Sequence, residues 1–167
     1  MRHYQTNMSC LLEIGEWCDY LREMGVYDNT KIIIAADHGY YLKHSKELMH
    51  GAEDMGMYFP LLLVKDFNSH GFAVSDEFMT NADVPTLATQ GTIEKPVNPF
   101  TGKPINNDEK TAHDQFVMLS HDWDVEVSNN GATYTPSKWA VITDNIWNRS
   151  DWTFIKKPVV LKDHKAP

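Results

Sequence analysis

The nine residues KIIIAADHG, at positions 31–39, decide how this chain can fold. A run of Ile and Ala that ends in polar residues is typical of a strand buried on both faces of a parallel sheet. Ligands of open α/β sheets bind beyond the carboxyl ends of the strands, so Asp37 and His38 are expected at that edge. Neighbouring side chains of a strand point to opposite faces. The two can converge only where the chain leaves the strand, and Gly39 permits that departure.

A carboxylate beside an imidazole is a pair of ligands that suits zinc or manganese. Asp37 and His38 are therefore candidate metal ligands. The alternative for His38 is a hydrogen-bonded residue at the end of a strand, with no ligand role.

Length and composition bound the class of protein. The chain has 167 residues and is 42% hydrophobic, which is enough for a sizeable core in a globular domain. Its formal net charge of −8 argues against nonspecific binding to nucleic acid. No apolar run approaches the roughly 20 residues of a membrane-spanning helix, and no signal peptide opens the chain. The first residues lead straight into helical sequence, so we expect a piece of a longer protein with an added Met.

Periodicity predicts the elements around the opening stretch. Apolar residues at helical spacing predict an amphipathic helix over 6–24, which should lie on one face of the sheet and end at a glycine. The run at 60–64 predicts a second buried strand in the same, mainly parallel sheet. A further helix is expected within 75–90. From residue 115 onward the pattern is rich in β formers, and the Asn-Gly pair at 130–131 predicts a hairpin in a small antiparallel sheet.

The order of short motifs resembles that of an enzyme family. The motifs are DNT at 28–30, DHG at 37–39 after the apolar strand, FPLLLV at 59–64 and DVPT at 83–86. From about Met8 to Gly91 the chain is similar to the C-terminal half of the sulfatase and phosphoethanolamine-transferase branch of the alkaline phosphatase superfamily. The rest, including NPFTGK at 98–103, resembles membrane-anchored sulfatase-like proteins of bacteria.

The resemblance implies a fold, a function and a location. Residues 1–110 would be the C-terminal half of an alkaline-phosphatase-like α/β/α sandwich, and residues 111–167 a small antiparallel β subdomain packed on it. The chain would be part of a metal-dependent sulfatase-like enzyme, either a sulfuric ester hydrolase or a phosphoethanolamine- or phosphoglycerol-type transferase. Asp37 and His38 would supply half of a site for divalent Zn, Mn or Ca, and the substrate would be an anionic sulfate or phosphate ester. The location would be extracytoplasmic, in the outer-facing domain of a membrane-anchored bacterial protein.

The resemblance also implies substrate contacts in the segment 40–58. Its composition predicts an irregular loop with a short helical turn near 45–49. Related enzymes often carry a His or Lys after Asp-His-Gly that contacts the anionic group of the substrate. His44, Lys46 and His50 are the candidates here, and the alternative for each is a solvated loop residue.

Two departures from the family pattern limit what the chain can do alone. Ala36 stands where the family has Ser or Thr, a small change that leaves the metal ligands in place. The nucleophile motif Cys-x-Pro-x-Arg is absent, because Cys10 is followed by Leu-Leu and Cys18 by Asp-Tyr. The acidic ligand of the first strand is missing as well. We therefore expect an inactive chain that lacks its N-terminal half and self-associates through the surface which that half would cover.

A second class of function remains open on the sequence alone. The chain would then be a non-catalytic binding or interaction module that reuses the fold, since a fold does not fix a function. A nucleophile-bearing segment upstream of Met1 would favour the enzyme. Asp83 is interpreted as a helix cap rather than as a further ligand.

Overall fold

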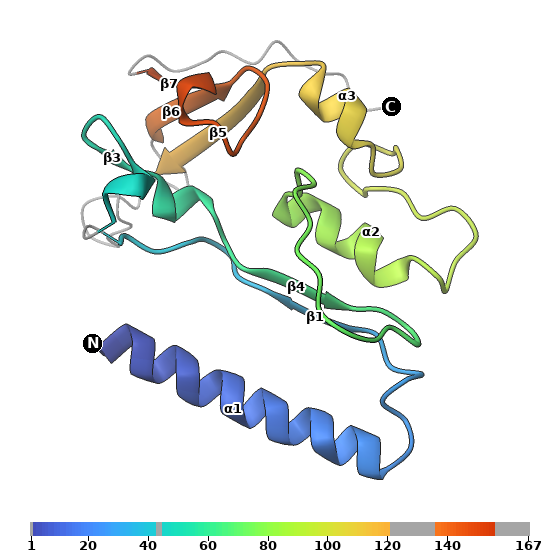
Figure 1. Ribbon diagram of the computed structural model, residues 1–167. Helices are drawn as coiled ribbons and strands as arrows, with labels where there is room; N and C mark the ends of the chain where they lie inside the picture. Colours follow the sequence, from blue (N-terminus) through green and yellow to red (C-terminus); the bar gives the residue numbers. More distant parts are fainter. Residues whose placement is uncertain (1, 43–44, 121–135, 156–167) are drawn as a thin grey trace, which may run out of the picture. The chain divides into compact units, whose positions relative to one another are not determined.

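The computed structural model describes residues 2–42, 45–120 and 136–155 (Figure 1). The chain divides into two compact units, which we call unit 1 (Met1–Ser75 and Thr80–Ile105) and unit 2 (Asp76–Met79 and Asn106–Pro167). Helices and small antiparallel sheets occur together, so the chain belongs to the general mixed α/β class. Within the described ranges, no helix combines the length and the apolar character needed to cross a membrane.

Unit 1 begins with α1 (Arg2–Glu23), which confirms the helix predicted from the apolar spacing. Ile14, Cys18 and Leu21 are half-buried, and their i, i+4, i+7 spacing places them on one stripe of the helix. The helix stops just before Gly25, whose φ of 68° is the left-handed conformation of a glycine cap. The predicted end of the helix is therefore confirmed.

The two predicted strands pair with each other, but in opposite directions. β1 (Ile32–Ala35) and β4 (Leu62–Lys65) form an antiparallel two-stranded sheet in which Ile33 lies opposite Val64. The expectation of one sheet is confirmed, and the expectation of parallel strands is wrong. A parallel return needs a crossover, usually a helix, whereas short turns and a hairpin connect these strands. The apolar run does not mark two buried faces either, because Ile32–Ile34 are half-buried and Val64 is exposed.

The segment between the two strands is more ordered than an irregular loop. It contains η1 (Lys46–Leu48), β2 (Met49–His50), β3 (Glu53–Asp54) and η2 (Met55–Tyr58). β2 and β3 form an antiparallel hairpin, and η1 confirms the short helical turn expected near 45–49. Met55 is 1% exposed and Asp54 is 7% exposed, so this connection holds a buried part of unit 1.

A short helical segment follows later in unit 1. It consists of η3 (Asn81–Asp83) and α2 (Val84–Thr89), and is shorter than the helix predicted within 75–90. Asp83 is buried, and its Oδ2 accepts hydrogen bonds from the Thr80 N–H (2.9 Å) and Thr80 Oγ1 (3.0 Å). Its Oδ1 accepts from Asn98 Nδ2 at 3.1 Å. The predicted capping role of Asp83 is confirmed at η3, where its side chain completes a capping box with Thr80, the N-cap residue. At α2 the Asp83 side chain makes no cap hydrogen bond.

Two lysines of unit 1 bind carbonyl groups at the ends of neighbouring segments. Lys31 Nζ donates to Leu87 O (2.9 Å) and Gln90 O (2.8 Å), and its side chain is 7% exposed. Lys65 Nζ donates to Thr30 O at 2.8 Å. Cations suit the carbonyl ends of helices and turns. These lysines attach α2 and the turn before β1 to the strands.

Unit 2 is built on a three-stranded antiparallel sheet of order β5-β6-β7, as its β-rich pattern predicts. Its elements are α3 (Asn107–Thr111), β5 (Gln115–Ser120), β6 (Pro136–Ile142), η4 (Arg149–Asp151) and β7 (Trp152–Ile155). The predicted hairpin at 130–131 lies outside the described residues. Ala140, Ile142, Ile146 and Trp152 are buried, and Trp152 Nε1 donates to Ile146 O at 2.9 Å, so these residues form the core of the unit.

Candidate functional site

Asp37 and His38 lie just beyond the end of β1, where the chain has left the strand. His38 Nε2 is 3.8 Å from Asp37 Oδ2, and the His38 N–H donates to Asp37 Oδ1 at 3.0 Å. The two side chains therefore converge, although they are neighbours in sequence. Both are open to solvent, with 88% of the Asp37 side chain and 60% of the His38 side chain exposed.

The His38 ring has a defined second partner. Its Nδ1 lies 2.6 Å from the carbonyl oxygen of Gly39. A carbonyl can only accept a hydrogen bond, so we assign the proton of the neutral ring to Nδ1. Nε2 then carries the lone pair, and this is the nitrogen that faces the Asp37 carboxylate.

Neighbouring elements hold the backbone of this pair in place. Three hydrogen bonds do so: Ala36 N–H to Leu61 O (2.9 Å), Gly39 N–H to Met57 O (3.0 Å), and Asn81 Nδ2 to Asp37 O (2.8 Å). Two of the acceptors belong to η2 and the residue before β4, and the third bond comes from η3. The sequence did not point to Asn81, because a side chain that donates to a backbone carbonyl 44 residues away leaves no local pattern.

Gly39 was expected to let the chain turn away from the strand, but the structure shows a different reason for a glycine at this position. Its φ is not in the left-handed region, in contrast to five other glycines of the chain. A Cβ on Gly39 would lie 1.8 Å from Gly56 O, and a Cβ on Gly56 would lie 2.5 Å from Tyr40 O. Both positions need glycine because two backbone segments pass too close for a side chain.

Tyr58 is the last residue of η2, in the connection between β1 and β4. Burial of its hydroxyl, with smaller contributions from Glu53 and Tyr41, raises the pKa of Tyr58 to about 12. The folded chain therefore favours the neutral phenol at pH values where an unfolded tyrosine ionises, near pH 10.

The stability of the chain should fall in alkali because of Tyr58. The neutral Tyr58 phenol contributes to the free energy of unfolding; this contribution is fully present below about pH 10 and is lost as the pH rises through about 12. We expect the free energy of unfolding of the wild type to decrease relative to Tyr58→Phe by about 1–2 kcal/mol over this range, after allowance for partial exposure. Urea denaturation of both proteins between pH 9 and pH 12 measures this difference. If the difference in free energy of unfolding between the two proteins does not change with pH, the raised pKa of Tyr58 is contradicted.

The structure places two of the other predicted site residues in the connection between β1 and β4. Lys46 lies in η1 and is exposed, and His50 lies in β2 opposite Glu53 and is half-buried. His44 lies outside the described residues. A substrate role for these three residues stays a prediction.

The described residues offer two ligands to a metal at this point. No group of three or more His, Cys, Asp or Glu side chains within them could hold an ion. His50 therefore does not complete a three-ligand set with Asp37 and His38. Zinc sites have at least three protein ligands. The pair would bind a metal firmly only with ligands from elsewhere.

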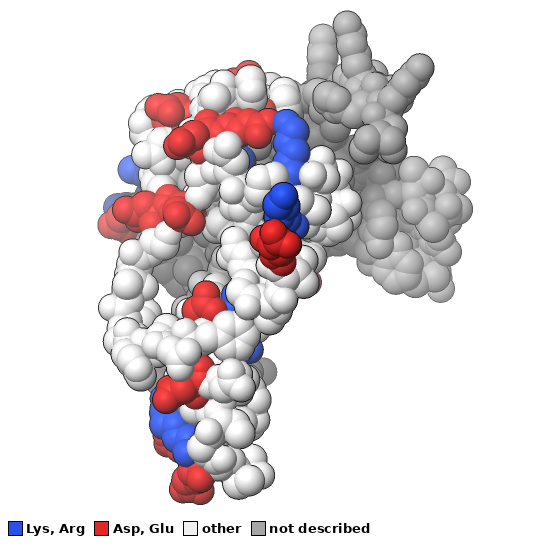
Figure 2. Space-filling model, turned by 90° about the vertical axis from the view of Figure 1, so that its right-hand side faces the viewer, with Lys and Arg blue, Asp and Glu red and all other residues white. Residues whose placement is uncertain are grey.

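The described charges on one face of the molecule do not gather into a single patch (Figure 2). Figure 2 shows one face of the molecule, on which Asp and Glu side chains form several separate groups with small groups of Lys and Arg between them. On this face the described charges are spread over several places rather than gathered at one.

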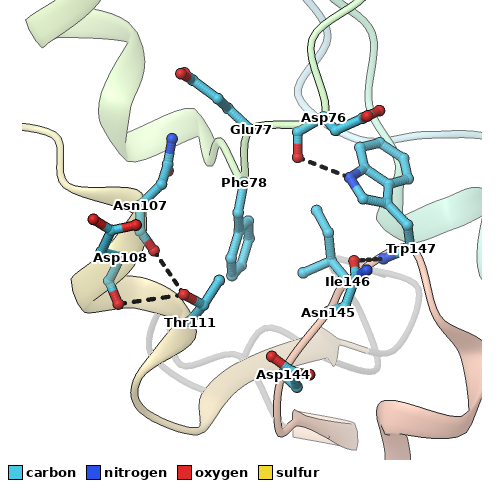
Figure 3. A pocket seen from close by; sticks show the side chains of 10 residues that line it. All are labelled: Asp76, Glu77, Phe78, Asn107, Asp108, Thr111, Asp144, Asn145, Ile146 and Trp147. Atoms are coloured by element: carbon cyan, nitrogen blue, oxygen red, sulfur yellow. Dashed lines mark hydrogen bonds between the residues drawn. The ribbon is translucent and has the colours of Figure 1, made fainter.

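Unit 2 contains an open cavity of about 340 Å³ that is lined by both polar and apolar side chains. Its lining includes Asp76, Phe78, Asp108, Asp144 and Trp147 (Figure 3). Trp147 Nε1 donates to Asp76 O at 3.0 Å, which ties the two segments that form the wall. Of the predicted site residues that the structure describes, none lines this cavity.

Comparison of the chain with protein-family models, with curated proteins and with solved structures finds no match. The geometry of Asp37 and His38 and the resemblance of the motifs therefore carry the functional argument.

Proposed function

We propose that this chain is the C-terminal portion of a metal-dependent sulfatase-like enzyme and supplies half of its metal site. The enzyme would be a sulfuric ester hydrolase or a phosphoethanolamine- or phosphoglycerol-type transferase. The observation that carries the proposal is the convergence of Asp37 and His38 beyond β1, with His38 Nε2 facing Asp37 Oδ2 at 3.8 Å. Metal–ligand bonds are about 2.0–2.2 Å long, so two atoms up to ~4 Å apart can reach one ion.

The two residues have different roles in this proposal. A bound divalent ion would lower the pKa of a hydroxyl nucleophile and stabilise charge on the group that is transferred. Asp37 offsets the charge of the ion with its carboxylate. His38 offers the lone pair of Nε2, and its Nδ1–H is held by the Gly39 carbonyl, the type of second contact that fixes the orientation of a metal-bound histidine.

The remaining ligands and the nucleophile would come from an N-terminal half of the same protein. The exposure of Asp37 and His38 fits a site of which one wall is supplied elsewhere. Large apolar side chains of α1 and β4 are also exposed, among them Leu12 (65%), Trp17 (46%) and Val64 (45%). A surface of this kind fits a neighbour that covers it.

The substrate and the location follow from the same proposal. The substrate would be an anionic sulfate or phosphate ester, with His44, Lys46 and His50 near its charged group. The domain would face outward from a membrane-anchored bacterial protein.

The metal role can be tested on the chain itself by NMR with Mn²⁺. We expect weak binding that broadens the imidazole resonances of His38, because two protein ligands are too few for a firm site. Asp37→Asn keeps the His38 ring and should abolish the effect. His113 is a matched control, since it is an exposed histidine next to Asp114. Equal broadening of His113 and His38 would contradict a specific pair.

The same preparation should not hydrolyse an aryl sulfate or an aryl phosphate with zinc, manganese or calcium, because it lacks the nucleophile motif. Metal-dependent turnover that disappears in His38→Ala would show that the chain holds a complete active site.

A binding or interaction module is the second candidate function. The cavity of unit 2 favours it, because carboxylates and aromatic rings line the same space. In that case Asp37→Asn and His38→Ala would leave binding of the partner unchanged, whereas substitutions in the cavity would weaken it.

A further inference from the structure

Asp54 is a buried carboxylate in the connection between β1 and β4. It is 7% exposed, and its Oδ1 accepts a hydrogen bond from the Gly56 N–H at 2.9 Å. This bond caps the first turn of η2. The other oxygen, Oδ2, is fully buried and has no hydrogen-bond partner among the described residues. Burial of an unsatisfied oxygen is destabilising, so packing alone does not explain a polar side chain here, whereas the cap through Oδ1 does.

The segment that Asp54 caps is in contact with the candidate site. Met57, in η2, accepts a hydrogen bond from the Gly39 N–H at 3.0 Å. Gly56 and Gly39 pass so close that neither position has room for a Cβ. A shift of η2 must therefore move Gly39. The Gly39 carbonyl is the partner of His38 Nδ1 at 2.6 Å, so the orientation of the His38 ring depends on the position of η2.

We propose that Asp54 is a positioning residue for the Asp37–His38 pair. Its Oδ1 fixes the first turn of η2, η2 fixes Gly39, and the Gly39 carbonyl fixes the His38 ring with Nε2 toward Asp37. The meaning of this arrangement for metal binding rests on the proposed function. The arrangement itself can be measured without a metal.

The test compares three variants of the whole chain. Asp54→Ala removes the cap, and Asp54→Asn keeps an oxygen in the position of Oδ1. Asn148→Ala is a matched control in unit 2, because the Asn148 side chain caps η4 through the Ser150 N–H in the same way. The measurements are amide exchange of residue 39, the ¹⁵N shifts of the His38 ring, and broadening of His38 by Mn²⁺, all at a temperature where the variants are folded.

We expect Asp54→Ala to speed amide exchange at residue 39 by about tenfold. It should change the His38 ring shifts and weaken Mn²⁺ binding there by about tenfold. Asp54→Asn and Asn148→Ala should behave like the wild type. A general loss of stability without a positioning role would leave the His38 shifts and the Mn²⁺ affinity of the folded protein unchanged.

The proposal is overturned if Asp54→Ala keeps the exchange rate of residue 39 and the ring shifts of His38. It is also overturned if Asp54→Asn loses protection at residue 39, and this variant decides the question if Asp54→Ala does not fold. Absence of Mn²⁺ broadening at His38 in the wild type would instead contradict the proposed function. The exchange rate and ring shifts would then still decide the role of Asp54.

Discussion

Replacement of Gly39 by alanine should destabilise unit 1 by about 3 kcal/mol or more, because the new methyl group has no space. Its Cβ would lie 1.8 Å from Gly56 O and 3.0 Å from Phe59 O, and both are backbone atoms that no side-chain rotation can move aside. The two segments must separate, and the hydrogen bond from the residue 39 N–H to Met57 O should break. Asp37 and His38 would then lose one of their three anchors.

Gly15→Ala is the matched control for this substitution. Gly15 lies inside α1, and nothing is within 4 Å of the position that its Cβ would occupy. The same change of one methyl group should stabilise the chain there by about 0.5–1 kcal/mol, because alanine is the better helix former. Urea denaturation followed by circular dichroism gives both free energies, and hydrogen exchange of residues 36–61 locates the change. A Gly39→Ala variant as stable as the wild type would show that these backbone segments do not pack as described.

The elements with strong local signals were predicted correctly from the sequence. The apolar spacing of α1, the glycine at its end and the capping box of Asp83 at η3 depend on contacts within a few residues, and the structure confirms each of them. The β-rich C-terminal pattern likewise gives an antiparallel sheet.

The relation between β1 and β4 could not be predicted in the same way. An apolar run such as residues 32–35 is compatible with a buried strand of a parallel sheet and also with one strand of a two-stranded antiparallel sheet. The direction of pairing depends on the 26-residue connection from Ala36 to Leu61, whose turns carry no strong signal. Polar segments of this kind are usually interpreted as loops, so the hairpin of β2 and β3 and its buried Asp54 were missed.

For the candidate site, the sequence indicated the two residues but not the hydrogen bonds that fix their backbone. Asp37 and His38 form a recognisable pair at the end of an apolar run, and their convergence is seen in the structure. The contacts that orient them come from Asn81 and Met57, which are distant in sequence and were not singled out. The ligand role of the pair remains a prediction.

Charges placed on α1 should abolish self-association of the chain. Ile14, Cys18 and Leu21 form the half-buried stripe of the helix, and Leu11 (43% exposed) and Trp17 (46% exposed) lie on either side of it. The apolar surface of the helix is therefore wider than its half-buried stripe, and the exposed part favours contact with another copy. Such a contact gains a free energy of roughly 25 cal/mol per Å² of apolar surface removed from water. In the described part, β1 and β4 pair only with each other, so their outer edges can add to such a contact.

The double substitution Leu11→Glu and Trp17→Glu tests this expectation. Burial of two unpaired carboxylates is unfavourable, so the variant should be monomeric at concentrations of tens of micromolar, where the wild type forms dimers or larger species. Both positions flank the half-buried stripe and do not belong to it, so the helix should still form. Phe72→Glu is the matched control, because Phe72 is 86% exposed and lies outside any helix or strand. Analytical ultracentrifugation of the three proteins gives their masses. A monomeric wild type would show that the exposed apolar surface of α1 does not bind a second copy, and the argument that a neighbour covers it would lose this support.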